Sequence, residues 1–115
     1  MPAQTVIGLF PDGQEGKGVV PMLANRGYGQ RDVETLGGRS AGLSVHGVDM
    51  IDKLADLGVA EVAQLETMVE AVGQGAVIVA ARTPNAEKAE QLENLMLEHG
   101  ATRCLQTPDT GWTTA

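Results

Sequence analysis

Three glycines, Gly13, Gly16 and Gly18, lie between the first predicted strand and the first predicted helix, where backbone amides can bind a phosphate group. Their spacing differs from the dinucleotide-binding pattern G-x-G-x-x-G, and no Lys-Ser or Lys-Thr pair follows them as in a P-loop. A flexible turn is therefore the simpler interpretation. The alternative is a binding site for an anionic metabolite, to which Arg39 and Arg82 would contribute positive charge.

His46 and His99 are the only histidines of the chain. His46 lies in a glycine-rich segment close to Asp49, so it is a candidate ligand or base, although a solvated loop residue explains it as well. His99 falls in the last turn of a predicted helix, where a histidine complements the helix dipole. Two histidines and one distant cysteine do not have the spacing of a zinc site, so we predict no metal.

Cys104 is the single cysteine, and it cannot form a disulfide within the chain. We predict a buried or half-buried structural thiol here, because no second cysteine completes a redox pair. The carboxylates of the predicted helices recur at the spacing of solvated helix faces. The sequence therefore predicts no cofactor and no catalytic residue, and an enzyme only if His46 lies in a pocket.

The charge balance narrows the choice of partners. Fifteen acidic residues against eight basic ones give a net charge of −7, which disfavours binding to nucleic acid or to anionic lipid. No charged and then apolar leader precedes the first predicted strand. We expect a cytoplasmic protein with no membrane association.

Two short runs, residues 5–10 and 76–81, are apolar on both alternating faces. Runs of this length and pattern are typical of strands that are buried on both faces at the centre of a sheet. A chain of 115 residues is long enough for one core of this kind. We predict a single domain over residues 1–107 and a flexible tail over residues 108–115.

The remaining elements follow from periodicity and from helix start and stop signals. Thr83-Pro84 is a good helix opening, because threonine can cap and proline suits the first helical position. We also expect a late start or a kink near Pro21 in the first helix. The predicted elements are a helix over 14–25, an edge strand over 32–36, a loop over 37–47, helices over 50–57 and 60–72, a helix from Pro84 to Gly100, and an edge strand over 101–107.

The alternation of these elements fits two architectures. One is a small α/β domain with a parallel sheet, and the other is an α+β ferredoxin-like sandwich in which the middle helices are an insertion between the second and third strands. Both place the first and third strands at the centre. The pattern of elements does not choose between them.

The chain also resembles the bacterial general stress protein (heat-induced stress protein) domain over most of residues 5–104. The resemblance implies a ferredoxin-like α+β fold and an association with stress conditions, and it implies no established chemistry. The segments that carry it are Val6-Ile7-Gly8-Leu9-Phe10 with Asp12, Gly27-Tyr28, Leu57-Gly58-Val59, residues 73–82 and His99-Gly100-Ala101.

The two-sided apolar strands raise the question of what covers the second face of the sheet. The middle helices or a second copy of the chain can do so, and we therefore expect a homodimer. The first functional hypothesis is a non-enzymatic stress-associated or regulatory interaction module that acts as a homo-oligomer. The alternatives are a sensor of an anionic metabolite near Gly13–Gly18 and a small ferredoxin-like enzyme that uses His46.

Overall fold

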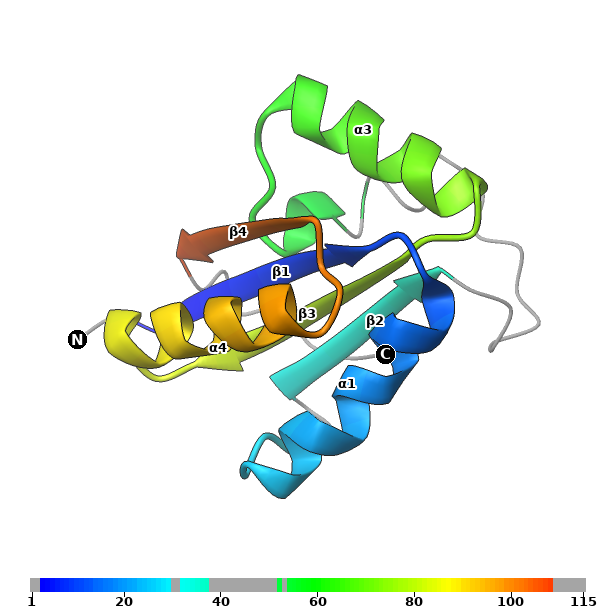
Figure 1. Ribbon diagram of the computed structural model, residues 1–115. Coiled ribbons are helices and arrows are strands. Elements are labelled where there is room, and N and C mark those ends of the chain that lie inside the picture. The colour runs from blue at the N-terminus through cyan, green and yellow to red at the C-terminus, as the bar shows by residue number, and fades with distance from the viewer. Residues whose placement is uncertain (1–2, 30–31, 38–51, 53, 109–115) are drawn as a thin grey trace.

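The computed structural model describes residues 3–29, 32–37, 52 and 54–108. Within this part of the chain, four strands form one sheet in the order β2-β3-β1-β4 (Figure 1). The strands are β1 (Gln4–Phe10), β2 (Val33–Gly37), β3 (Val77–Thr83) and β4 (Arg103–Pro108). The helices are α1 (Gly13–Asn25), α3 (Val62–Gly73) and α4 (Ala86–Glu98), and residues 54–56 are also helical.

The predicted α+β class is confirmed, and the parallel-sheet alternative is wrong. Each neighbouring pair in the sheet, β2 with β3, β3 with β1 and β1 with β4, is antiparallel. Alternation of strands and helices correctly indicates that β1 and β2 run in the same direction. However, β3 inserts between them and runs the opposite way, which the order of elements along the chain does not reveal.

The prediction that β1 and β3 occupy the centre of the sheet is confirmed. Every side chain of the apolar runs 5–10 and 77–81 is at most 5% exposed. Val6, Phe10 and Val79 face one side, where they pack with the buried faces of α1 and α4. Ile7, Ile78 and their neighbours face the other side. Helices therefore cover both faces of the sheet (Figure 1).

The cover of the second face comes from the same chain. Leu54, Leu57, Val59 and Met68 are all buried in the cluster that contains Ile78. Residues 54–59 and α3 thus cover the face for which the sequence analysis also considered a second copy of the chain. This removes the sheet-on-sheet argument for a homodimer over the residues that the structure describes.

Helix α1 begins at Gly13 and includes all three glycines, so the flexible-turn interpretation is wrong. Asp12 caps the helix, because its side chain accepts a hydrogen bond of 2.8 Å from the Gln14 amide. Gly16 is buried against the sheet, and a Cβ atom there would lie 3.0 Å from the Cβ of Val77. The expected late start is not observed, since close contact with the sheet favours helix from Gly13 onward.

Pro21 lies inside α1 on an exposed part of the helix. A proline lacks the amide hydrogen that would bond to the carbonyl four residues earlier, which normally disfavours a helix interior. On an exposed face, water can bind that carbonyl instead. The packing of Val19 and Leu23 on the sheet then holds the helix on both sides of the proline.

The start of α4 differs from the sequence prediction. Asn85 caps this helix, and its side-chain oxygen accepts a hydrogen bond of 2.9 Å from the Lys88 amide. Thr83 is instead the last residue of β3, where its hydroxyl donates a hydrogen bond of 3.1 Å to the Gln4 carbonyl oxygen. Asparagine is at least as good an N-cap as threonine, so Asn85 caps the helix while Thr83 pairs within the sheet.

The other boundaries agree with the predictions to within about two residues, and β2 and β4 are the predicted edge strands. Strand β4 includes Pro108, the first residue of the predicted tail, while residues 109–115 lie outside the described part of the chain. Most of the predicted loop over 37–47 and three residues of the predicted helix over 50–57, namely 50, 51 and 53, also lie outside it. Among the described residues, no helix has the length and apolar character needed to cross a membrane.

Gly16 and Gly18 provide a matched test of how α1 packs. Alanine at either position gains helix propensity, but at Gly16 it also places a Cβ about 3 Å from atoms of Val77 and Phe10, whereas at Gly18 it meets nothing within 4 Å. We expect Gly16→Ala to be about 1–3 kcal/mol less stable than Gly18→Ala in urea unfolding followed by circular dichroism. Equal stabilities would contradict the close approach of α1 to β3.

The Asn85 cap makes a second prediction. Asn85→Ala removes the acceptor for the Lys88 amide, and we expect a loss of about 1 kcal/mol in the free energy of unfolding. Asn85→Asp keeps an acceptor at the same position, so it should retain most of the stability. Both variants are compared with the unmodified chain in the same urea titration. An equal loss in the two variants would show that the cap is not the cause.

Candidate functional site

An open groove of about 440 Å³ lies at the end of the sheet where β3 ends and β2 begins. This volume is within the range of small-molecule sites. Three segments that are distant in the sequence line the groove: the end of α1, the residues flanking β2 and β3, and one face of α4. The lining residues are Arg26, Gly27, Tyr28, Asp32, Arg82, Pro84, Lys88, Gln91, Leu92 and Leu95.

The end of α1 positions Arg26 and Tyr28. Gly27 has a φ of +96°, a left-handed conformation that ends a helix at low cost for glycine. The turn is closed by a hydrogen bond of 3.0 Å from the Tyr28 amide to the Leu23 carbonyl oxygen. Because Leu23 is fully buried in the core, this bond anchors the turn and places both side chains at the groove.

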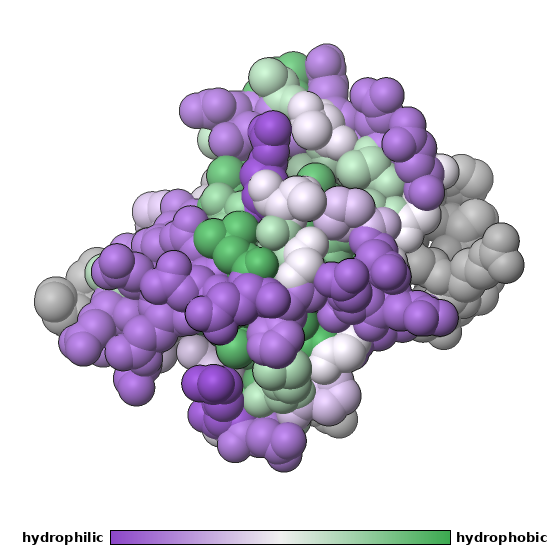
Figure 2. Space-filling view, viewed as in Figure 1, coloured by the Kyte–Doolittle hydropathy of each residue, from purple (hydrophilic) through white to green (hydrophobic). Residues whose placement is uncertain are grey.

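Helix α4 contributes one face to the groove. Lys88, Gln91, Leu92 and Leu95 follow the three- and four-residue steps that bring side chains to the same side of a helix. Leu92 and Leu95 are buried and form an apolar floor, while Lys88 and Gln91 are exposed at the rim. Figure 2 shows that hydrophilic residues cover the outer side of α4, so the groove borders a polar surface.

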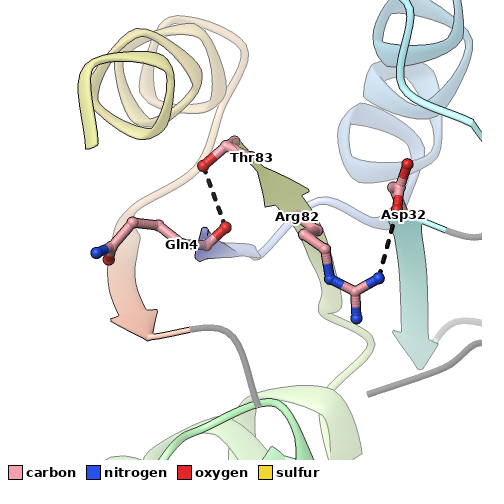
Figure 3. Close-up of polar contacts among 4 residues, drawn as sticks. All are labelled: Gln4, Asp32, Arg82 and Thr83. Carbon is pink, nitrogen blue, oxygen red and sulfur yellow. Dashed lines mark hydrogen bonds and ion pairs between the residues drawn. The ribbon is translucent and has the colours of Figure 1, made fainter. Parts of the chain in front are cut away.

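Asp32 and Arg82 form an ion pair across the ends of β2 and β3. The strands pair Val33 with Ala81, and one further step places Asp32 opposite Arg82. The distance from Arg82 Nη1 to Asp32 Oδ1 is 3.4 Å. Figure 3 marks this contact with a dashed line between the two side chains. With side chains that are 23% and 44% exposed, this pair contributes at most about 1 kcal/mol to stability. Solvent therefore reaches both charged groups.

The other two cations of the groove have no such partner among the described residues. Neither the Arg26 guanidinium nor the Lys88 ammonium forms a hydrogen bond or an ion pair with another side chain in that part of the chain. Three of the described basic residues of an acidic protein thus line one groove, and Asp32 is the one carboxylate among the described lining residues. The groove is a local region of positive charge on a chain whose net charge is −7.

Tyr28 is half-buried at the groove, and burial raises the pKa of its phenol, an effect that the nearby positive charge of Arg26 partly opposes. The phenol therefore stays protonated at neutral pH. In this state it offers an O–H donor as well as an aromatic ring. A ligand in the groove can thus meet charged groups, a neutral hydrogen-bond donor and an apolar floor.

The structure does not bring together the residues that the sequence suggested as a metabolite site. Gly13 lies near Gly75 and Val77, at the start of β3, whereas Arg82 is near the end of that strand. Gly16 packs against the sheet and Gly18 is exposed on α1. Arg39 and His46 lie outside the described residues. Of the four suggested residues that the structure describes, Arg82 alone lines the groove.

The predicted structural role of Cys104 is supported by its surroundings. The thiol is half-buried, and burial, followed by the negative charge of Glu93, raises its pKa to about 12. His99 is the exposed C-terminal cap residue of α4. Within the described part of the chain, no three His, Cys, Asp or Glu side chains lie together in a way that could hold a metal ion.

Sequence reasoning missed Arg26, Tyr28, Asp32 and Lys88 as groove residues. One local signal was available: Lys88, Gln91 and Leu95 share a helix face. No comparable signal links that face to Arg26, because the two meet only when α1 and α4 pack on the same side of the sheet. Tertiary packing therefore creates this site.

Comparison of the chain with protein-family models, with curated proteins and with solved structures found no match. The functional argument therefore depends on the geometry and charge of the groove.

The raised pKa of Cys104 predicts an unreactive thiol. At pH 8, a pKa of about 12 leaves a thiolate fraction on the order of 10⁻⁴, compared with about one tenth for an ordinary cysteine. We expect iodoacetamide to alkylate the native chain at least about 100-fold more slowly than the chain unfolded in urea at the same pH. Glu93→Gln should recover only a small part of this difference, since burial is the larger cause. Equal rates for the native and unfolded chains would refute the prediction.

Proposed function

We propose that this protein is a non-enzymatic module that binds a small anionic ligand in the groove between α1, α4 and the ends of β2 and β3. The observation that carries the proposal is the gathering of Arg26, Arg82 and Lys88 at one groove with an apolar floor. Positive side chains placed over an apolar surface are what an organic anion requires.

The proposal includes a ferredoxin-like arrangement of the sheet. Its support is the antiparallel strand order β2-β3-β1-β4, with α1 following β1 and α4 following β3. Two strand-helix-strand units joined in this way are typical of the split βαβ pattern. The same arrangement agrees with the resemblance to the general stress protein domain, and an association with stress conditions is part of the proposal on that basis.

A binding role suits the groove better than catalysis does. Arg26, Arg82 and Lys88 bind anions through charge and hydrogen bonds. The groove is open to solvent, and its single carboxylate, Asp32, is paired with Arg82. General acid and base chemistry usually employs groups with shifted pKa values in a water-excluding site. The lining residues therefore favour recognition and regulation over a chemical step.

The test is a thermal-shift screen of the full chain against phosphate monoesters, carboxylates, sulfonates and, as a contrast, organic cations. A ligand present at 100 times its Kd stabilises the native state by about 2.7 kcal/mol, which raises the Tm by several degrees. We expect anions to raise the Tm and cations to leave it unchanged. Arg26→Gln and Lys88→Gln should each weaken the effect.

Lys17→Gln is the matched control for these two variants. Lys17 is an exposed cation on α1 that does not line the groove, so its replacement changes the net charge by the same amount. Its response to anions should equal that of the unmodified chain. A screen in which no anion raises the Tm would overturn the proposed function, and so would an equal loss in all three variants.

A further inference from the structure

We propose that the groove selects doubly charged organic anions, with phosphate monoesters as the class that fits, over singly charged anions of the same shape. This inference rests on the small-anion binding function proposed above and adds the class of ligand. It follows from the charge of the lining residues, from the hydrogen-bond donors that they supply and from the apolar surface beneath them.

The charge of the groove can be counted over the lining residues that the structure describes. Arg26, Arg82 and Lys88 contribute three positive charges, Asp32 contributes one negative charge, and Tyr28 is neutral, as are the five other lining residues. Three minus one leaves a net charge of +2. A dianion brings the groove to neutrality, whereas a monoanion leaves one positive charge uncompensated. Coulomb attraction therefore favours the dianion at equal distance.

The donors suit a tetrahedral phosphate group. Each arginine presents a fork of N–H donors that matches phosphate oxygens, and lysine adds a compact positive charge. The contact between Arg82 and Asp32 is 3.4 Å long, compared with about 2.7–2.9 Å for a strong charge-assisted hydrogen bond. A contact of this length is weak, so a phosphate oxygen in the groove can compete with Asp32 for the Arg82 guanidinium.

The rest of the lining suits an organic body attached to the phosphate. Pro84 and the Tyr28 ring border the groove, and Leu92 and Leu95 form its floor. The protonated Tyr28 hydroxyl can donate a hydrogen bond to the ester oxygen or to the body of the ligand. Inorganic phosphate has no apolar group that could contact these side chains. A monoester with a compact apolar or aromatic group uses the charged lining and the apolar lining together.

Phenyl phosphate and benzenesulfonate are a matched pair of probes. They share an aromatic ring and a tetrahedral anionic head, but at pH 8 phenyl phosphate carries about two negative charges and benzenesulfonate carries one. Binding to the full chain is measured by isothermal titration calorimetry at low ionic strength. We expect phenyl phosphate to bind at least about tenfold more tightly than benzenesulfonate.

A change of pH tests the same point without a mutation. The second pKa of a phosphate monoester is about 6, so at pH 5 phenyl phosphate is close to a monoanion. Its advantage over benzenesulfonate should fall to less than about threefold. Benzenesulfonate keeps its charge over this range, and at pH 5 the two probes carry nearly the same charge, so the protein's own charge at that pH acts on both almost equally.

Two variants change the charge of the groove in opposite directions. Asp32→Asn raises the charge of the groove to +3. It should increase the affinity for phenyl phosphate more than the affinity for benzenesulfonate, because the added attraction scales with ligand charge. Lys88→Gln lowers it to +1 and should reduce the ratio of the affinities. Lys17→Gln, which leaves the groove unchanged, should keep the ratio of the unmodified chain.

The outcomes separate this inference from the proposed function. Equal affinities for the two probes at pH 8 overturn dianion selection but leave an anion site in place. If neither probe binds while other anions raise the Tm, the inference is wrong and the proposed function stands. If no anion binds at all, both are wrong. A tighter phenyl phosphate complex whose advantage disappears at pH 5 and in Lys88→Gln supports the inference.

Discussion

The antiparallel pairing of β1 with β3 is the interaction on which the rest of the structure depends. The register runs from Gln4 opposite Thr83 to Phe10 opposite Val77 and joins two strands that are apolar on both faces. Burial of apolar surface is the main favourable term in folding, so a strand pair of this kind is stable only when both of its faces are covered. Helices α1 and α4 cover one face, and α3 with residues 54–59 covers the other.

The groove is a consequence of this layered arrangement. Charged side chains are costly to bury without partners, and they therefore collect where the apolar layers end. At the end of β3 the sheet meets the last turn of α1 and one face of α4, so Arg26, Arg82 and Lys88 lie around one opening. The ion pair between Arg82 and Asp32 at the groove also joins the edge strand β2 to the central strand β3.

Much of the fold was predictable, because two-sided apolar runs and helical periodicity are local in the sequence. The central strands, the edge strands and most element boundaries follow from these signals. The failures share one cause. Gly16 and Pro21 are unfavourable in an isolated helix by about 1–3 kcal/mol, but the packing of α1 on the sheet outweighs this. Thr83 can cap a helix, but its pairing with β1 keeps it in β3.

The sequence by itself determined the mixture of strands and helices and the two-sided burial of residues 5–10 and 76–81, since these depend on side-chain type and short-range spacing. Only the tertiary structure decided the antiparallel direction of β3, the helical cover of the second face and the membership of the groove. The direction of β3 and the membership of the groove depend on segments more than fifty residues apart in the chain, such as β1 with β3 and Arg26 with Lys88. The packing of such segments against one another does not follow from any local sequence pattern. The groove residues can therefore be identified only from the tertiary structure.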